Sequence, residues 1–357
     1  HALGVPTSRA LAAVITGETV YRDQPKPGGI LTRVAASHIR IGTFQFASML
    51  QDGETTQNDS SLKSLADYVI NRHYPDCAHA DQPYLALLNQ VIRAQAALVA
   101  QWMSLGFIHG VMNTDNVLVS GETIDYGPCA FMDAYHPETV FSSIDKRGRY
   151  AYQMQPAICQ WNMARFAESL VPLLDDDQDS ALTMATQVIR SMMPHYEQVW
   201  LARMRAKLGL HTEQQADKQL IDDLLAAMDA NEVDFTLLFR SLCQAVADPL
   251  GSPQPAQLFS SPQDWQHWAE RWSARLALET EHDNGRAQRM RAVNPSVIPR
   301  NHRVQQAIDV ATASGDFSDF QRLVQVLATP FEDHPEDQQW LGPPPADQKV
   351  CQTFCGT

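Results

Sequence analysis

The sequence predicts an α+β protein in which a few strands near the start precede a body built mostly of helices. Three observations support this fold class. Apolar and polar residues alternate in residues 9–34, as in strands. A long amphipathic helix is expected from Tyr84 to Leu105. Apolar residues then recur at helical spacing through most of residues 157–332.

The first expected element is a β-hairpin in residues 9–23 with its turn at Gly17 and Glu18. A further strand should include Ile30, and "SHIRIGTF" at residues 37–44 fits a turn or a short helix. Residues 60–73 predict an amphipathic helix, and the expected apolar face carries Leu62, Leu65, Tyr68 and Val69.

The strongest expected helix, Tyr84 to Leu105, carries a wide apolar stripe and should end at Gly106. A short strand, a loop, a hairpin over "VLVSGETI" and the triplet Asp125-Tyr126-Gly127 follow. Residues 125–156 are rich in Pro, Gly and aromatic residues, which predicts an ordered but irregular segment. A Pro-rich, extended tail is expected from residue 342.

Composition excludes some functions. The 357 residues carry a formal net charge of -14, which argues against general binding to nucleic acid or anionic membranes. No apolar run approaches the roughly 20 residues of a membrane span. The six cysteines form no Cys-x-x-Cys pair, so neither a zinc site nor a disulfide framework is indicated.

The segment "HGVMNTDNVLVSGETIDYG", residues 109–127, resembles a protein-kinase catalytic loop with one position changed. His109 and Asn116 keep the kinase interval, and Asp125 begins a triplet like the kinase metal-binding motif, but Val111 stands where the catalytic aspartate is expected. Asp115 can serve as the base instead, and the amide of Asn116 and carboxylate of Asp125 are suitable magnesium ligands. The alternative is that these residues only cap turns.

Several longer stretches resemble the selenoprotein O family and its bacterial YdiU relatives. They include "LGVPTSRALA", "GGILTRVAASHIRIGTF", "TIDYGPCAFMDAY", "GRYAYQMQP", "WNMARFAESL" and "VNPSVIPRNHRVQQAI", and the resemblance covers His1 to Thr357. It implies a protein-kinase-like fold, mostly the helical C-lobe with part of the N-lobe sheet at the start. It also implies a protein adenylyltransferase that binds ATP inverted relative to kinases and transfers AMP to Ser, Thr or Tyr hydroxyls of proteins.

The same resemblance implies roles for individual residues. Asp115 matches the catalytic base, and Asn116 and Asp125 match the ligands of Mg²⁺ or Mn²⁺. Asp125 also faces the nucleotide, and Arg40 matches a residue that contacts the phosphates of ATP, a task that suits the arginine fork. The expected partners are ATP and protein substrates, with no nucleic acid and no membrane.

Three departures from the family pattern qualify these expectations. The glycine-rich loop, its lysine and the partner glutamate are expected upstream of His1, so residues 1–357 alone should bind ATP poorly and turn over little. A second phosphate-binding arginine of some relatives is replaced by Ala47. Cys355 is a candidate redox thiol near the C-terminus, but Phe141 occupies the place of its family partner, and Cys129 or Cys351 could substitute.

The expected organisation has three parts. Residues 1–80 are N-lobe strands with a linking helix, residues 81–335 are the C-lobe with a helical extension, and residues 336–357 are the tail. The expected location is intracellular, cytoplasmic for a bacterial protein and mitochondrial for a eukaryotic one. Two alternative functions remain open. Val111 also fits a silent pseudokinase scaffold, and the His-Gly pair occurs in small-molecule phosphotransferases, which however keep an aspartate at the position of Val111.

Overall fold

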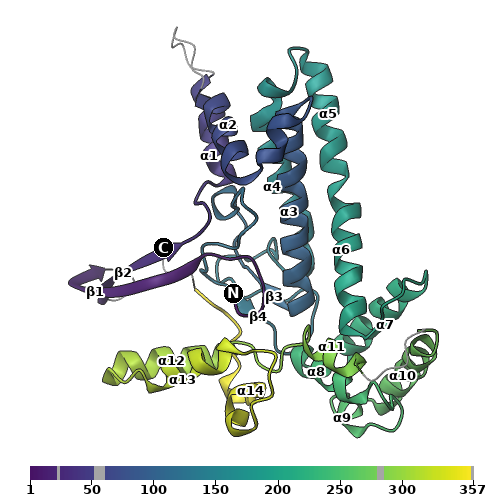
Figure 1. Cartoon of the computed structure of the whole chain (residues 1–357). Coiled ribbons are helices and arrows are strands. Elements are labelled where there is room, and N and C mark those ends of the chain that lie inside the picture. Colours follow the sequence, from purple (N-terminus) through teal and green to yellow (C-terminus); the bar gives the residue numbers. More distant parts are fainter. Residues whose placement is uncertain (22–24, 52–60, 280–284, 355–357) are drawn as a thin grey trace.

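A computed structural model describes residues 1–21, 25–51, 61–279 and 285–354. The chain is mostly helical with two small sheets, which confirms the α+β class. Long helices stand side by side in the body, and shorter helices form the base (Figure 1). Two arms project to the same side: a β-hairpin, and below it a pair of helices near the C-terminus.

The hairpin arm consists of β1 (Arg9–Tyr21) and β2 (Pro25–Val34), which pair in antiparallel fashion. The predicted turn at Gly17 and Glu18 is wrong, because β1 continues through it. The register shifts between Ile15 and Thr19, and Gly17 has a φ of 78°, so these residues form a bulge inside one long strand. The hydroxyl of Thr16 accepts a hydrogen bond from the Glu18 amide, which stabilises this local bend.

Two helices follow the hairpin. α1 (Ile41–Gln51) corresponds to the short helix expected in this region, and α2 (Ser61–His73) matches the predicted helix. Leu62 and Val69 of α2 are fully buried as expected. Tyr68 does not share their buried face, since half of it is exposed and its hydroxyl accepts a hydrogen bond from Arg72.

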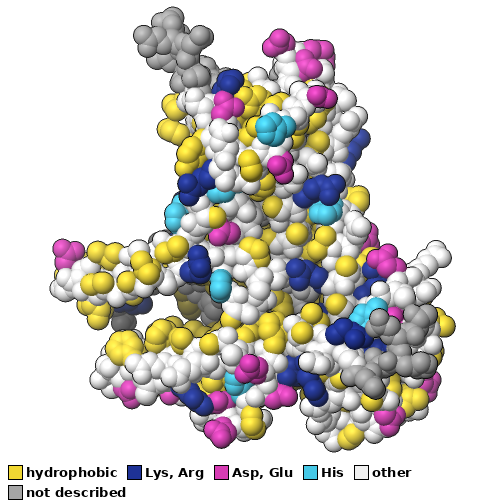
Figure 2. Space-filling view, viewed as in Figure 1, with side chains coloured by type: hydrophobic (Ala, Val, Ile, Leu, Met, Phe, Trp, Pro, Cys, Tyr) yellow, Lys and Arg dark blue, Asp and Glu magenta, His cyan; other side chains and the backbone are white. Residues whose placement is uncertain are grey.

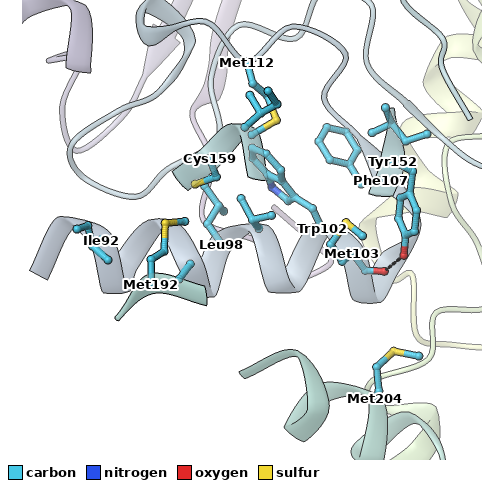
Figure 3. Packing of buried hydrophobic residues seen from close by; sticks show 14 of the residues in the cluster. Ile92, Leu98, Trp102, Met103, Phe107, Met112, Tyr152, Cys159, Met192 and Met204 are labelled. Carbon is cyan, nitrogen blue, oxygen red and sulfur yellow. Dashed lines mark hydrogen bonds between the residues drawn. The ribbon is translucent and has the colours of Figure 1, made fainter. Parts of the chain in front are cut away.

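The longest helix, α3 (Pro83–Leu105), ends at Gly106 as predicted, with a φ of 72°. The strand β3 (Phe107–Ile108) then pairs with β4 (Ala130–Phe131). Figure 3 shows how the stripe of α3 packs: Trp102 and Phe107 lie together, and Met112 of the following loop lies close by. The Tyr152 hydroxyl donates to the carbonyl of Met103 at 2.5 Å. The core of α3 therefore supports the loop that carries the predicted site.

The rest of the chain is mainly helical, as predicted. α3 packs against α4 (Gln155–Leu174) and α6 (Met192–Lys207). The other helices are α5 (Gln178–Arg190), α7 (Asp217–Ala230), α8 (Phe235–Ala245), α9 (Pro253–Ala256), α10 (Pro262–Leu276), α11 (Arg286–Arg291), α12 (Asn301–Ser314), α13 (Ser318–Ala328) and α14 (Gln338–Leu341). None of the helices in the described ranges is long and apolar enough to cross a bilayer.

The lower arm, α12 and α13, has a small core of its own that contains Leu323, Val326 and Trp340. Apolar side chains are also exposed on both projecting arms (Figure 2). Arg300, at the base of α12, is 1% exposed and joins this arm to the body through ion pairs with Asp133 and Asp234, both at 2.6 Å.

Candidate functional site

His109 begins the predicted catalytic loop and is completely buried. Its Nε2 donates to the carbonyl of Ile124 at 2.7 Å, and its backbone amide donates to Gln155 Oε1 at 3.0 Å. Burial lowers the pKa of the His109 imidazole, so the ring is neutral. His109 thus braces the loop against the segment that leads to Asp125.

Asp115 and Asn116 lie in a 3₁₀ turn, Thr114–Asn116. The Nδ2 of Asn116 donates to the carbonyl of Val111 at 2.9 Å, and this bond fixes the amide plane. Because the amide nitrogen of Asn116 is held in this hydrogen bond, the amide oxygen Oδ1 is the atom that can bind a cation. Val111, at the position of a kinase catalytic aspartate, contributes its backbone to the site.

The Asp115 side chain is exposed and lies against the first turn of α1. A Cβ placed on Gly42 would come within 2.4 Å of Asp115 Oδ1 and 3.6 Å of Thr114 Oγ1. Gly42 therefore leaves the space that the carboxylate occupies.

Asp125 has a φ of 56°, a left-handed conformation that is uncommon for a residue with a side chain. Its carboxylate pairs with two guanidinium groups, Arg33 at 2.5 Å and Arg40 at 3.2 Å. Partial burial raises the pKa of the Asp125 carboxyl, but the hydrogen bonds from the two arginines outweigh this effect, and the net pKa lies below its ordinary value. Strained backbone of this kind is concentrated at functional sites.

A short hairpin connects these groups. Val117 and Thr123 form an antiparallel bridge, which supports the predicted hairpin although no regular strands develop there. Arg40 forms a second antiparallel bridge with Leu118 of this hairpin, and the Ile41 amide donates to the carbonyl of Val117 at 3.0 Å. This pairing places Arg40 beside Asp125, so the structure brings two of the predicted site residues into contact.

Arg33 was missed by the sequence interpretation. It lies near the end of β2, and its contact with Asp125 spans 92 residues. The sequence contains only a weak indication of this role: Arg33 lies in the predicted strand that precedes the "SHIRIGTF" segment. Ala47, where some relatives were expected to have a second arginine, is buried in α1. Arg33 thus supplies the second guanidinium group from a different element.

The predicted metal ligands can be tested by their donor chemistry. Within the described ranges, no three His, Cys, Asp or Glu side chains cluster as a metal site. Asn116 and Asp125 contribute one amide and one carboxylate from the two ends of the short hairpin. Both are hard oxygen donors, and magnesium commonly takes one or two such groups together with phosphate oxygens. The pair therefore fits a nucleotide-bound magnesium ion better than a site made only of protein ligands.

The redox prediction falls partly outside the structure. Cys355 lies beyond the described residues, whereas Cys351 is an exposed free thiol. Cys129 is also free, and burial raises the pKa of its thiol to about 11. The tail reaches this region, because the Thr353 amide donates to the carbonyl of Phe141 at 2.7 Å and its hydroxyl to that of Pro128 at 2.6 Å.

Comparison with known proteins gives consistent results. Residues 1–328 match the family described as "Protein adenylyltransferase SelO". The "Protein nucleotidyltransferase YdiU" of Rhizobium etli (strain CFN 42) is 54% identical over 356 residues, which is 100% of this chain and 70% of the relative. The protein of the same name from Rhizobium meliloti is 52% identical over 357 residues, with 100% and 72% covered. That of Rhodopseudomonas palustris (strain BisB5) is 52% identical over 356 residues, with 100% and 71% covered.

Proposed function

The chain belongs to the SelO family of protein adenylyltransferases, and from this we propose that it transfers AMP from ATP to Ser, Thr or Tyr hydroxyls of proteins with the help of Mg²⁺. The observation that supports this most is the carboxylate of Asp125 held between Arg33 and Arg40, at one end of the short hairpin that starts at Asn116. Such a set of groups suits the polyphosphate of a nucleotide.

The proposed architecture is protein-kinase-like. α3, the loop of residues 109–116, the short hairpin and the Asp-Tyr-Gly triplet occur in the order of a kinase C-lobe. β1 and β2 would then belong to the N-lobe sheet. In this arrangement the nucleotide-binding cleft would lie between the hairpin arm and the loop, where Asp125 meets Arg33.

Arg33 and Arg40 are proposed to bind the phosphates of ATP. A guanidinium group binds carboxylate and phosphate with the same fork geometry. Each arginine can therefore exchange its contact with Asp125 for one with a phosphate oxygen. This exchange would free the Asp125 carboxylate, which with Asn116 would hold the magnesium ion. When bound, the metal neutralises charge on the phosphates and orients them.

Asp115 is proposed to act as the general base. It accepts the proton of the acceptor hydroxyl while the hydroxyl oxygen attacks the α-phosphorus of ATP. The bond from the α-phosphorus to the bridging oxygen of the β-phosphate breaks, and diphosphate leaves with the electron pair. Asp115 lies four positions after Val111, so an inverted nucleotide, with its α-phosphate near Asp115, accounts for a catalytic loop that has no aspartate at position 111.

The test is transfer of label from ATP radiolabelled at either the α- or the γ-phosphate. We expect α-label, but not γ-label, on protein, and loss of roughly 10²–10⁴-fold in Asp115→Asn, the range of general-base effects. Asp125→Ala should abolish labelling. Residues 1–357 should be assayed beside the longer Rhizobium etli relative, because we expect weak turnover from residues 1–357 alone.

Each contrary outcome has a clear meaning. Transfer of γ-label alone would replace this proposal by an ordinary kinase activity. A second contrary outcome has two parts: the relative transfers neither label, and the substitution that corresponds to Asp125→Ala leaves the cellular function of the relative intact. In that case the silent scaffold is the better interpretation.

A further inference from the structure

A groove lies between α3 and α6. Gln101 and Ser104 of α3 line it, whereas Gln95 and Trp102 of α3 bond to the short hairpin of the proposed active site. The groove encloses about 880 Å³, within the usual size range of small-molecule sites. Its lining includes four basic side chains, Arg93, His195, Arg203 and Lys207, and among the described residues no Asp or Glu lines it. Basic and histidine side chains are visible over α3 and α6 in Figure 2. This is unusual in a chain whose formal net charge is -14.

Lys207 forms the inner end of the groove and is 3% exposed. Its Nζ lies 4.2 Å from the ring centre of Phe239 and 5.5 Å from that of Phe235. Within the described ranges, no carboxylate pairs with Lys207. A buried ammonium without a counter-ion is costly, and the two aromatic rings compensate for only part of that cost.

Arg203, one turn before Lys207 on α6, is partly buried. Its Nε is buried and has no hydrogen-bond partner among the described residues. His195 and Arg93 line the outer part of the groove, and Arg93 is exposed. From His195 to Lys207 is twelve residues of helix, about 18 Å at 1.5 Å per residue. The basic groups are therefore spread along an elongated groove.

We propose that this groove is a binding site for a small molecule that carries several phosphate groups, with Lys207 and Arg203 as the inner anion contacts and His195 and Arg93 as the outer ones. Such a ligand supplies the negative charge that the buried ammonium of Lys207 and the partly buried Arg203 lack. Arginine and lysine are the usual phosphate-binding residues, and an elongated polyanion matches basic groups spread along a groove between two helices. This site is separate from the proposed active site and does not depend on the adenylyltransferase mechanism.

Proton uptake should accompany binding. Burial lowers the pKa of Lys207 to about 7, so about half of the Lys207 side chains are protonated at neutral pH when the groove is empty. An anion bound beside Lys207 raises its pKa again. The other charged or titratable groups near it are Arg93, His195, Arg203, Arg240, Cys243 and Arg291. With a pKa of about 7, the Lys207 contribution should tighten binding about tenfold from pH 8 to pH 6.

The test is calorimetric titration of inorganic tripolyphosphate into the chain without divalent cations. We expect Lys207→Met and Arg203→Gln each to weaken binding at least tenfold, and Lys207→Met to lose the Lys207 part of the pH dependence, about tenfold between pH 8 and pH 6. Arg190→Gln, an equal charge change on an exposed residue of α5, should bind within twofold of the unsubstituted chain. Citrate serves as a carboxylate probe and should bind much more weakly than tripolyphosphate.

Three outcomes would overturn the proposal. The first is unchanged tripolyphosphate binding in both groove variants. The second is loss of binding in Arg40→Gln but not in Lys207→Met, since the anion would then occupy the proposed active site. The third is equal affinity for citrate, which would reject phosphate as the recognised group. Methionine keeps the unbranched stem of Lys207 against the two phenylalanine rings, and circular dichroism would verify folding.

Discussion

Gly42 and Asp115 are in such close contact that a Cβ on Gly42 would come within 2.4 Å of the Asp115 carboxylate. The first turn of α1 thereby fixes where this carboxylate can lie. Since an aspartate side chain can rotate away from a methyl group, the expected consequence of a clash is displacement of the proposed base, with the fold intact.

Gly42→Ala should therefore separate activity from stability. Alanine in a helix is favoured over glycine by about 0.5–1 kcal/mol, so the free energy of unfolding should stay equal or rise. AMP transfer should fall at least tenfold, because the base is displaced from the acceptor hydroxyl. Ser48→Ala, on the same helix and away from Asp115, is the matched control. Full activity in Gly42→Ala would mean that Asp115 is not the base, or that its position does not matter.

Arg33→Gln tests whether the arginine that meets Asp125 from β2 binds nucleotide. Loss of one charge-assisted contact to phosphate should weaken ATP binding by about 1.5–3 kcal/mol, roughly tenfold or more, with a similar effect in Arg40→Gln. Lys26→Gln removes the same charge from an exposed position of β2 and should have little effect. Fluorescence titration with a labelled ATP analogue gives the affinities. Equal binding by the Arg33 variant and the control would limit Arg33 to pairing with Asp125.

Local patterns in the sequence were sufficient to predict most of the helices and the loop of residues 109–116. The stripe from Leu88 to Met103 predicts α3 closely, because one face of that helix is buried along its length. The turn at Gly17 was mistaken because a glycine with positive φ occurs in bulges as well as in turns. Arg33 could not be assigned without a register for the hairpin arm, since its contact with Asp125 spans 92 residues. The groove at Lys207 depends on how α3 packs against α6, which the sequence does not specify.

Arg300→Ala should destabilise the protein strongly. The Arg300 guanidinium joins Asp133 and Asp234 and also donates to the carbonyl of Leu341 at 3.0 Å. Removing it leaves two carboxylates close together, one of them largely buried, without a counter-ion, which typically costs about 3–5 kcal/mol. Chemical denaturation should show this loss, with Arg147→Ala, an exposed arginine, as control. A change below about 1 kcal/mol would show that water compensates the two carboxylates.

Lys207→Met should make the protein more stable in a pH-dependent way. Burial lowers the pKa of Lys207 from 10.5 to about 7, so between these values the unfolded chain binds a proton that the folded chain does not. The native stability of the unsubstituted chain therefore rises with pH across this window, and methionine removes the effect. The advantage of the variant should approach about 5 kcal/mol below pH 7, since each pKa unit is worth about 1.36 kcal/mol, and should vanish towards pH 10.5.

Urea denaturation at pH 6, 7, 8 and 9 measures this difference in the absence of phosphate, because an anion bound in the groove would stabilise the unsubstituted chain and reduce the gap. Lys146→Met, at an exposed position, should show no pH-dependent gain. If the gain in Lys207→Met is the same at every pH, it comes from apolar packing alone. Lys207 would then keep an ordinary pKa, and its ammonium would be solvated within the groove.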